Sequence, residues 1–331
     1  MNSFGNIFRV HIFGESHGEC VGIIIDGVPA GLAFTEENLL PDLERRKGGL
    51  QKGTTPRQEA DYPIFKSGIF NGKSTGFPLT ILFKNNNFRS EDYQEQRAIP
   101  RPGHADWVAH QKFGGNEDYR GGGHFSARLT TGIVAAGAIA KMLIPQIIIS
   151  AKVISIGGET DLEKGLQNAI DAKDSVGGIV ECKVTGLPVG LGEPYFNSLE
   201  SMLSHIMFSI PAVRGIEFGT GFQAANMFGS EHNDAIENNE GKTTTNHAGG
   251  IVGGISNGNE LVFRLAIKPT SSTPKNQQSL NWETGEVEDF SIKGRHDLCV
   301  ALRAPVIVEA ATALVLVDCM MYEQLIPRII K

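Results

Sequence analysis

The stretch GGGHFSARLTTGIVAAGAIAKML, residues 121–143, decides the fold prediction for this chain. Three glycines precede a hydroxyl residue, and a long alanine-rich run without proline predicts a helix over residues 126–143. A second segment with the same order, Gly-rich, then Arg, then Ala-rich, spans residues 294–320. It predicts a helix over 304–325, whose alanines indicate close packing in a buried core. The repeated pattern predicts an internally duplicated architecture.

Strand-like runs surround these two helices. β-branched and aromatic residues predict strands at 7–13, 21–25, 147–156, 178–185, 214–218 and 261–267. Two shorter helices are predicted, one from the N-cap Thr35 to the stop at Gly48 and one over 197–209 with a single apolar face. Because strands and helices do not alternate as in a doubly wound sheet, the predicted class is α+β. No composition shift marks a boundary, so residues 1–331 form one predicted domain.

The bulk composition is that of a globular protein that does not bind nucleic acid. The chain has 331 residues, 40% of them hydrophobic and 20% charged, with a formal net charge of −7 and a pI of about 5.8. A general nucleic-acid binder needs a basic surface, which this balance argues against. A local cluster of arginines for a small anionic ligand remains compatible with the negative total.

The cysteines and apolar stretches indicate a cytoplasmic protein without a metal site. Cys20, Cys182, Cys299 and Cys319 form no CxxC pair and no Cys/His cluster with zinc spacing, which fits a reducing compartment. The N-terminus lacks the apolar region of a signal peptide. The most apolar late stretch, residues 306–317, is interrupted by Glu309 and is too short to span a bilayer, so no membrane partner is expected.

Two nucleotide-binding patterns are rejected. SGIFNGKS, residues 67–74, has Ser67 where a Walker A loop has its first glycine, and Pro78 prevents the helix that a phosphate-binding loop needs. GTGFQA, residues 219–224, resembles a dinucleotide fingerprint, but no βαβ frame surrounds it. A turn after a strand is the better interpretation of the second pattern.

Two long polar segments are predicted to be loops. Residues 48–61 and 84–103 are rich in glycine, asparagine and charged side chains and have no apolar period. Both exceed ordinary connection lengths, and loops of that length often serve as lids over a site. We therefore expect them to close over bound ligands.

Two motifs carry a histidine among glycines. GESHG, residues 14–18, follows a strand and presents His17, whose imidazole suits general acid chemistry near neutral pH. The alternative is a turn histidine bonded to its own backbone. RPGHAD, residues 101–106, combines Arg101, His104 and Asp106, an anion donor with an oriented imidazole. Its alternative is a loop-closing turn with a surface salt bridge.

Three further motifs have a binding interpretation. GGGHFSAR places Ser126 and Arg128 at a helix start, where an anion or a plain glycine-rich cap fits equally. HAGGIVGG (247–254) and KPTSS (268–272) are able to wrap a flat cofactor and its phosphate, or to pack a strand closely before a turn. GRHD, residues 294–297, favours a site at a helix start, with a capping Asp297 as the alternative.

Together these segments closely resemble the chorismate synthase family. The three family signatures are matched by GESHGECVGIIIDGVP (14–29), GGHFSARLTTGIVAAGAI (122–139) and RHDLCVALRAPVIVEAA (295–311). RPGHAD, DYRGGG, SIPAVRG, NHAGGIVGGIS and KPTSS stand between them in the family's order. The resemblance covers nearly the whole chain, and three long signatures in order make coincidence improbable.

The resemblance implies a reaction and a fold. The expected activity is the anti-1,4-elimination of phosphate from 5-enolpyruvylshikimate 3-phosphate, which gives chorismate in the shikimate pathway of aromatic amino-acid biosynthesis. The family needs reduced FMN without net redox change, and many members associate with NADPH. The family fold is a β-α-β sandwich with central helices between two antiparallel sheets and internal pseudo-symmetry. The expected assembly is a homotetramer.

The resemblance also implies catalytic residues. His17 matches the histidine that protonates the leaving phosphate, and His104 matches the histidine near flavin N1. Asp297 matches the carboxylate proposed to take a proton from flavin N5. No metal is expected.

The binding positions follow from the same resemblance. Positions matching the substrate-binding set are Arg45, Arg101, Ser126, Arg128 and Arg295. Positions matching flavin contacts are His124, Phe125, Ser126, Pro211, Ala212, Gly253, Lys268, Pro269, Thr270, Ser271, Ser272 and Arg295. Arg46 and Lys52 match positions associated with NADPH. His124-Phe125 stand where some members have Arg-Ser, which changes the charge beside the flavin, and Lys52 replaces an arginine of some relatives.

Two other functions remain open from the sequence. A flavin oxidoreductase would use NADPH to reduce a bound or free flavin, and turnover with NADPH as the sole reductant would distinguish it. A non-catalytic phosphate-ligand binding protein would keep the cations without needing His17, His104 and Asp297, because pure binding does not require titrating groups.

Overall fold

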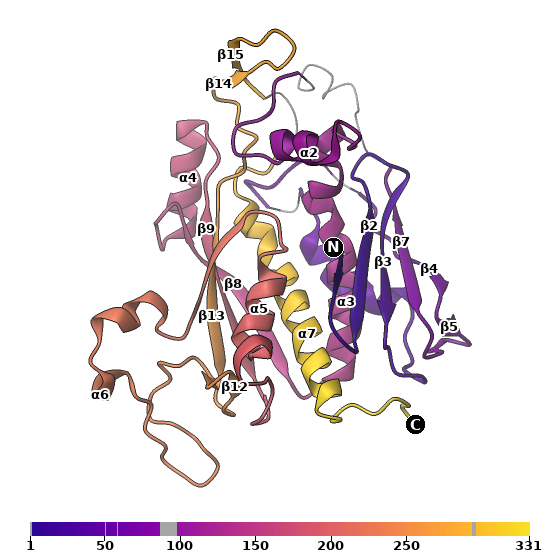
Figure 1. Cartoon of the computed structure of the whole chain (residues 1–331), viewed down its shortest axis with the longest axis vertical. Coiled ribbons are helices and arrows are strands. Elements are labelled where there is room, and N and C mark those ends of the chain that lie inside the picture. The colour runs from indigo at the N-terminus through magenta and orange to yellow at the C-terminus, as the bar shows by residue number, and fades with distance from the viewer. Residues whose placement is uncertain (1, 50, 58, 87–97, 293–295) are drawn as a thin grey trace.

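The chain folds around two antiparallel sheets and two long helices. The structure is a computed structural model that describes residues 2–49, 51–57, 59–86, 98–292 and 296–331. The first sheet has the strand order β1-β2-β3-β7-β4, and the second has the order β10-β13-β9-β8. Helices α3 (Thr130–Leu143) and α7 (Ala304–Tyr322) pack against each other, with α3 on the first sheet and α7 on the second (Figure 1).

The bounds of the sheets follow the alternation of buried side chains. The first sheet contains β1 (Ser3–Phe4), β2 (Arg9–Gly14), β3 (Cys20–Asp26), β4 (Ile64–Ser67) and β7 (Leu79–Lys84). The second contains β8 (Ile148–Ile156), β9 (Gly178–Thr185), β10 (Val213–Phe218) and β13 (Leu261–Ile267). In β3, Val21, Ile23 and Ile25 are buried, as expected for the face that packs on α3.

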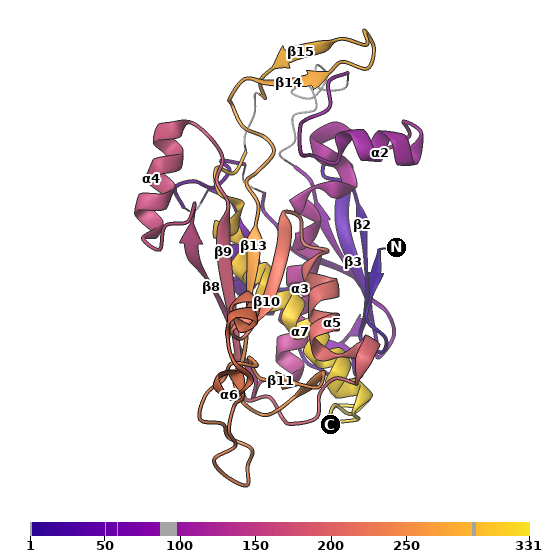
Figure 2. The ribbon, with the colours of Figure 1, turned by 60° about the vertical axis from the view of Figure 1, so that its left-hand side comes forward.

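Shorter elements connect these layers. The remaining helices are α1 (Leu40–Arg46), α2 (Asp106–Phe113), α4 (Leu162–Ala172), α5 (Leu199–Met207) and α6 (Gly229–His232). Short 3-10 turns span Glu36–Leu39, Arg120–Phe125, Ala127–Leu129, Tyr195–Asn197, Gly221–Asn226 and Val300–Arg303. Three small hairpins pair β5 (Ile69–Phe70) with β6 (Lys73–Ser74), β11 (Ile251–Val252) with β12 (Ile255–Ser256), and β14 (Gln277–Leu280) with β15 (Val287–Phe290). The β14–β15 hairpin and the α6 region project from opposite ends of the molecule (Figure 2).

The interface of α3 and α7 is unusually close. An added Cβ on Gly137 of α3 would lie 2.3 Å from the Cβ of Ala310 and 2.4 Å from its Cα. Only glycine fits at that position, so the small residues of both helices set their separation. Nearly all of α7 is buried, including two acidic residues, Glu309 and Asp318.

The two buried acids of α7 tie distant segments together. Asp318 accepts hydrogen bonds from the backbone N–H groups of Asn6 at 2.9 Å, Ile7 at 2.7 Å and Phe8 at 2.9 Å. Glu309 accepts from Arg45 of α1 at 2.7 Å and from the backbone N–H of Ala151 in β8 at 3.1 Å. Buried charges are tolerated when they are paired and hydrogen-bonded in this way.

The C-terminus returns to the beginning of the chain. The backbone N–H of Ala30 donates to the carbonyl of Arg328 at 3.0 Å, and Ile330 donates to Ala30 at 2.8 Å. Among the described residues, the stretch Val300–Tyr322 is long and apolar enough to cross a membrane. Because 78% of its apolar window is buried inside the structure, it is the core helix of this fold.

The predicted α+β class with antiparallel sheets is confirmed. The predicted long helices appear as α3, α5 and α7, and the six predicted strands appear within about two residues of their expected ends. Thr35 caps the turn that leads into α1, as expected. The rejected segment 67–74 contains the β5–β6 hairpin, and GTGFQA forms a turn after β10, as predicted, which continues into a short 3-10 helix.

Candidate functional site

A cavity of about 680 Å³ opens where the motif segments meet. Its walls come from the segments 2–12, 46–48, 55–57, 59–61, 101–105, 121–133, 205–214, 268–272 and 296–303. Eight Lys or Arg residues and three carboxylates line it among the described residues: Arg46, Lys47, Arg57, Arg101, Arg128, Arg214, Lys268 and Arg303 against Glu59, Asp61 and Asp297. A volume of this size suits a small-molecule site, and the excess of positive charge suits anionic ligands.

His17 lies at the edge of this cavity, against Gly121. An added Cβ on Gly121 would lie 2.0 Å from the His17 ring, so a glycine with φ of 60° is required there. The His17 Nδ1 lies 3.0 Å from the hydroxyl of Ser16. Burial, and next the Arg57 guanidinium, lower the pKa of His17 to about 4. The imidazole is therefore neutral at pH 7 when no anion is bound.

The RPGHAD segment forms a hydrogen-bonded cluster in the cavity wall, in which Arg101 and His104 both contact Asp106. Arg101 donates to both carboxylate oxygens of Asp106, from Nε at 2.7 Å and from Nη2 at 2.8 Å. His104 Nδ1 lies 2.6 Å from Asp106 Oδ1. A carboxylate at that distance favours the proton on Nδ1, which leaves Nε2 as the acceptor. Although burial raises it, the bonds from Arg101 and His104 hold the pKa of Asp106 far below its usual range.

His104 remains mainly neutral in this environment. Burial lowers the pKa of His104, and the hydrogen bond to Asp106 opposes that effect. The KPTSS segment lies against the same loop, because Ser271 Oγ donates to the Gly103 carbonyl at 2.7 Å. Ser272 Oγ accepts from Arg101 Nη1 at 3.5 Å. Two motifs that are 167 residues apart by their numbers, 101 and 268, therefore form one wall.

Asp297 lies in the cavity wall at the start of the last helical segment. Its Oδ1 accepts from the Thr55 backbone N–H at 2.8 Å, and its Oδ2 accepts from Arg303 Nη1 at 2.9 Å. The predicted loop 48–61 therefore contacts GRHD through Thr55. The carboxylate is fixed by a backbone donor and a guanidinium, which keeps it oriented toward the cavity lining.

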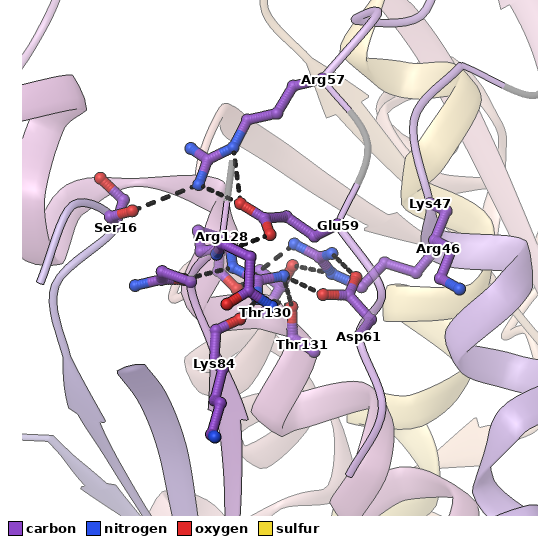
Figure 3. A network of polar contacts seen from close by, with 12 residues as sticks. Ser16, Arg46, Lys47, Arg57, Glu59, Asp61, Lys84, Arg128, Thr130 and Thr131 are labelled. Carbon is purple, nitrogen blue, oxygen red and sulfur yellow. Dashed lines mark hydrogen bonds and ion pairs between the residues drawn. The ribbon is translucent and has the colours of Figure 1, made fainter. Parts of the chain in front are cut away.

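Arg46 and Arg128 are buried in the cavity wall and share one carboxylate. Arg46 Nη1 lies 3.3 Å from Asp61 Oδ2, and Arg128 Nη1 pairs with Asp61 Oδ1. Figure 3 shows these groups together with Arg57 and Glu59, whose side chains pair at 2.7 Å. Ser126 caps the helical turn that carries Arg128, accepting from its backbone N–H at 3.2 Å.

The described lining includes buried polar atoms without a hydrogen-bond partner. Among them are Nε2 of His124, whose Nδ1 is bonded to the Gly14 carbonyl at 2.9 Å, and Oγ1 of Thr270. Nearby, Ala212 adopts a left-handed conformation with φ of 74°, which is strained for a residue with a Cβ. Buried orphan groups and local strain often mark places that a ligand completes.

Several predicted residues lie elsewhere. Arg45 is paired with Glu309 at 2.7 Å and is absent from the described lining. Lys52 donates to Gln167 of α4 at 3.0 Å on the exposed surface. Gly253 lies in the β11–β12 turn, and Pro269 is the one KPTSS residue outside the described lining. Arg295 lies outside the described residues, as do Leu50, Gln58 and residues 87–97 of the two predicted loops.

The structure adds cavity residues that sequence reasoning missed. Arg57, Glu59, Asp61, Arg214 and Arg303 all line the cavity. A signal existed for the first three, because a charged cluster in an unusually long Gly-rich loop favours a site. No local pattern distinguished Arg303 from a solvent-exposed arginine before a helix.

The comparisons with known proteins agree with one another. A family model described as "Chorismate synthase" matches residues 8–321. The chain is 64% identical over 332 residues to the chorismate synthase of Chitinophaga pinensis, with 100% of both chains covered. It is 44% identical over 361 residues to that of Dehalococcoides mccartyi, covering 100% of this chain and 99% of the relative.

A solved structure titled "Crystal Structure of Chorismate Synthase" has the same fold. It superposes with a TM-score of 0.73 at 26% sequence identity and covers 96% of this chain and 93% of the other. The match extends over both sheets and the helices between them. The likeness is therefore one of the whole chain and not of a single motif.

Proposed function

The chain belongs to the chorismate synthase family and is a lyase, and from that premise we propose how its cavity carries the reaction. The substrate is 5-enolpyruvylshikimate 3-phosphate, and the products are chorismate and phosphate. The observation that supports this most directly is the excess of cations in one cavity that has His104 in its lining and His17 against its lining residue Gly121. A substrate with two carboxylates and a phosphate requires such compensation, and arginine keeps its charge.

The residues of the cavity fit reduced FMN. His124 Nε2 and Thr270 Oγ1 are buried and have no hydrogen-bond partner. The polar edge of a bound heteroaromatic ring would supply the missing hydrogen bonds. Lys268 and Arg214, which face the same space, suit the flavin phosphate. We propose that the flavin is held by His124, Phe125, Ser126, Pro211, Ala212, Lys268, Thr270, Ser271 and Ser272. Bound reduced flavin supplies electron density to the reacting substrate, and the protein orients both.

Gly253, Pro269 and Arg295 remain predictions from the sequence. Gly253 and Pro269 are not part of the described lining of this single chain. Arg295 belongs to the residues that the structure does not describe. We propose no contact for them within the cavity.

We propose that the substrate anions are bound by arginines of the cavity lining. We propose that Arg101 and Arg128 hold substrate together with Ser126, as predicted, and that Arg46 takes the place expected of Arg45. This exchange follows from position, because Arg46 lines the cavity while Arg45 is bound to Glu309. Arg57 adds a fifth donor group beside His17.

His17 is proposed to protonate the leaving phosphate. Its pKa of about 4 without ligand makes it neutral, and a phosphate dianion beside it would raise that pKa. Substrate binding and protonation are then coupled at one nitrogen. His104 is proposed to present Nε2 to the flavin edge while Asp106 holds the proton on Nδ1. Asp297, fixed by Thr55 and Arg303, is proposed as the proton acceptor.

Anaerobic turnover with chemically reduced FMN tests this assignment. Phosphate and chorismate are expected in equal amounts, with chorismate followed by absorbance. His17→Ala and His104→Ala should each slow turnover by about 10²–10⁴-fold, the usual size of general acid–base catalysis. His11→Ala, an exposed histidine bonded to Ser3, is the control that should keep native turnover. Tight FMN binding without product would exclude the elimination.

The use of NADPH is a separate proposal. Arg46 is buried in the cavity wall, whereas Lys52 lies on the surface beside α4. These positions do not form one binding site in the single chain, so we propose that an external reductant is needed. Turnover that starts from oxidised FMN with NADPH as the sole reductant would contradict this proposal.

Assembly, duplication and location are also proposed. Exposed aromatic side chains, among them Tyr195 at 86%, Phe196 at 93% and Phe222 at 81%, favour a homotetramer. Light scattering at several protein concentrations measures the oligomeric state.

We propose that the chain is one domain, a β-α-β sandwich whose two sheet-and-helix halves are a duplication. The four free thiols support a reducing, cytoplasmic compartment.

A further inference from the structure

Asp61 occupies a position between two cavity arginines. Its side chain is 3% exposed, and its two oxygens pair with different residues, Oδ2 with Arg46 and Oδ1 with Arg128. Arg46 comes from the end of α1, and Arg128 from the turn before α3. Asp61 thus joins two elements at the point where both reach the cavity (Figure 3).

Two guanidiniums this close need a counter-ion. Arg46 and Arg128 are 3% and 6% exposed, so water screens them poorly. Burial is the largest effect on Arg46 and lowers its pKa to about 9, while Asp61 acts in the opposite direction. A buried charge that loses its partner costs several kcal/mol. The Asp61 carboxylate therefore keeps both cations in the wall.

The remaining donors of the two arginines fix their planes. Arg46 donates from Nε to Thr130 Oγ1 at 2.9 Å and from Nη2 to the Ala127 carbonyl at 2.7 Å. Arg128 donates from Nε to Asn85 Oδ1 at 2.9 Å and from Nη2 to the Lys84 carbonyl at 3.2 Å. Most N–H groups of the two guanidiniums thus donate hydrogen bonds within the protein, and these bonds fix the orientation of each guanidinium plane.

The backbone at Asp61 is also specialised. Its φ is 50°, a left-handed conformation that a non-glycine residue rarely adopts. Such conformations persist where surrounding contacts hold them, and here the contacts are the two ion pairs. The chain accepts this strain at a residue whose side chain pairs with both arginines.

We infer that Asp61 is a positioning residue of the elimination reaction, which sets the spacing of Arg46 and Arg128 and leaves them with a single compensating charge. The inference rests on the proposed function, because that function assigns both arginines to the substrate anions. Asp61 does not touch the reacting atoms. It lowers the net positive charge of the wall by one, so that the cations attract the substrate without releasing product phosphate too slowly.

Two variants separate the charge of Asp61 from its position. Asp61→Asn keeps the shape and removes the charge. We expect kcat to fall by about tenfold or more because the two guanidiniums separate, while KM for the substrate does not rise. Inhibition by inorganic phosphate should become several-fold stronger, since one more positive charge is left uncompensated. Asp61→Glu keeps the charge and displaces it, so kcat should fall while phosphate inhibition stays within about twofold of native.

Asp42→Asn is the matched control. Asp42 also bridges two cations, Arg45 at 3.1 Å and Lys141 at 2.8 Å, but it lies outside the described cavity lining. It should leave kcat and phosphate inhibition native. A purely structural role for Asp61 would lower the melting temperature of Asp61→Asn and leave the phosphate inhibition constant unchanged.

Each outcome has one meaning. If native enzyme releases no phosphate, the proposed function fails. If native enzyme is active and Asp61→Asn matches it in kcat and in phosphate inhibition, this inference alone fails. Should Asp61→Asn not fold, Asp61→Glu decides, because native kcat in a folded Glu variant would overturn the positioning role.

Discussion

His17 shows how a single residue is prepared for its ligand. It is 4% exposed, and Arg57 and Arg120 lower its pKa while Asp118 and Glu59 oppose them, all after the larger effect of burial. The site therefore holds an imidazole that takes up a proton only when an anion arrives. An exposed histidine would be protonated half of the time near its ordinary pKa and would depend less on the ligand.

The lowered pKa of His17 predicts a pH dependence of stability. Its pKa is 6.5 in the unfolded chain and about 4 in the folded one. Between these values the unfolded chain binds more protons, so the contribution of His17 is fully present above pH 6.5 and is lost as pH falls toward 4. His17→Gln should reduce the slope of the urea midpoint against pH between pH 4 and pH 6.5. His11→Gln should keep the native slope, and an unchanged slope in His17→Gln would contradict the lowered pKa.

The motif residues were predictable, but their partners were not. His17, Arg101, His104, Ser126 and Arg128 stand in recognisable segments, and the structure places all five in or against one cavity. Asp61 had only the weaker signal of a charged residue in a long loop, and Arg303 had none, because their roles come from pairs 67 and 6 positions away in sequence. Adjacent residues also point to different sides of a helix: Arg46 lines the cavity, whereas Arg45 pairs with Glu309. A pattern gives the segment of a site, and the fold decides which side chain faces the ligand.

Elements were predicted best where the apolar pattern in the sequence is strong. The long helices and the strands of the second sheet have strong apolar patterns. α2 was missed because its apolar residues follow no helical period, and it starts directly at the site residue Asp106. α4 was also missed, although Leu162, Leu166 and Ile170 recur every four residues. β7 was missed at the boundary of the predicted loop.

The α3–α7 contact predicts an inverted effect of a helix-favouring substitution. Gly137→Ala gains about 1 kcal/mol of intrinsic helix propensity, but its Cβ would overlap Ala310. Overpacking costs about 1–3 kcal/mol, so the variant should unfold at lower denaturant concentration. Gly229→Ala is the control, since an added Cβ there meets nothing within 4 Å. Equal stability of Gly137→Ala and native chain would contradict the close helix contact.

The anchor at Asp318 predicts a local opening of residues 6–8, which connect β1 and β2. Asp318→Ala removes acceptors for three backbone donors of residues 6–8, and we expect a loss of about 2–4 kcal/mol. Amide hydrogen exchange of Ile7 and Phe8 should increase more than that of β3. Because Ser3 and Phe4 line the cavity, FMN affinity should also fall. Protection of Ile7 and Phe8 that equals native would contradict the anchor.

At the scale of the whole molecule, the two sheets and the helices α3 and α7 share one hydrophobic core. α7 packs on β8 and β9, α3 packs on β3, and the two helices form their closest contact at Gly137 and Ala310. Glu309 adds ion pairs from α7 to α1 and α3 and accepts a hydrogen bond from a backbone N–H of β8. Neither sheet has a separate hydrophobic core among the described residues. One cooperative unit is the physical expectation.

That shared core predicts a single unfolding transition. Denaturation followed by circular dichroism and by thiol labelling of the buried Cys182 and Cys319 should give one midpoint. Cys182 lies in the second sheet and Cys319 in α7, so the labels report different layers. Labelling of Cys182 at a lower denaturant concentration than Cys319 would show that the second sheet unfolds independently.

The place of α7 at the end of the chain has a consequence for synthesis. Both sheets leave the ribosome before the helix that fills the space between them, and β1 must wait for Asp318 to hold its neighbours. A growing chain therefore carries two half-covered sheets until α7 emerges, after which Ile330 also pairs with Ala30. Nascent chains cut before Val300 should depend on chaperones throughout, and we expect the emergence of α7 to convert an aggregation-prone intermediate into the enzyme.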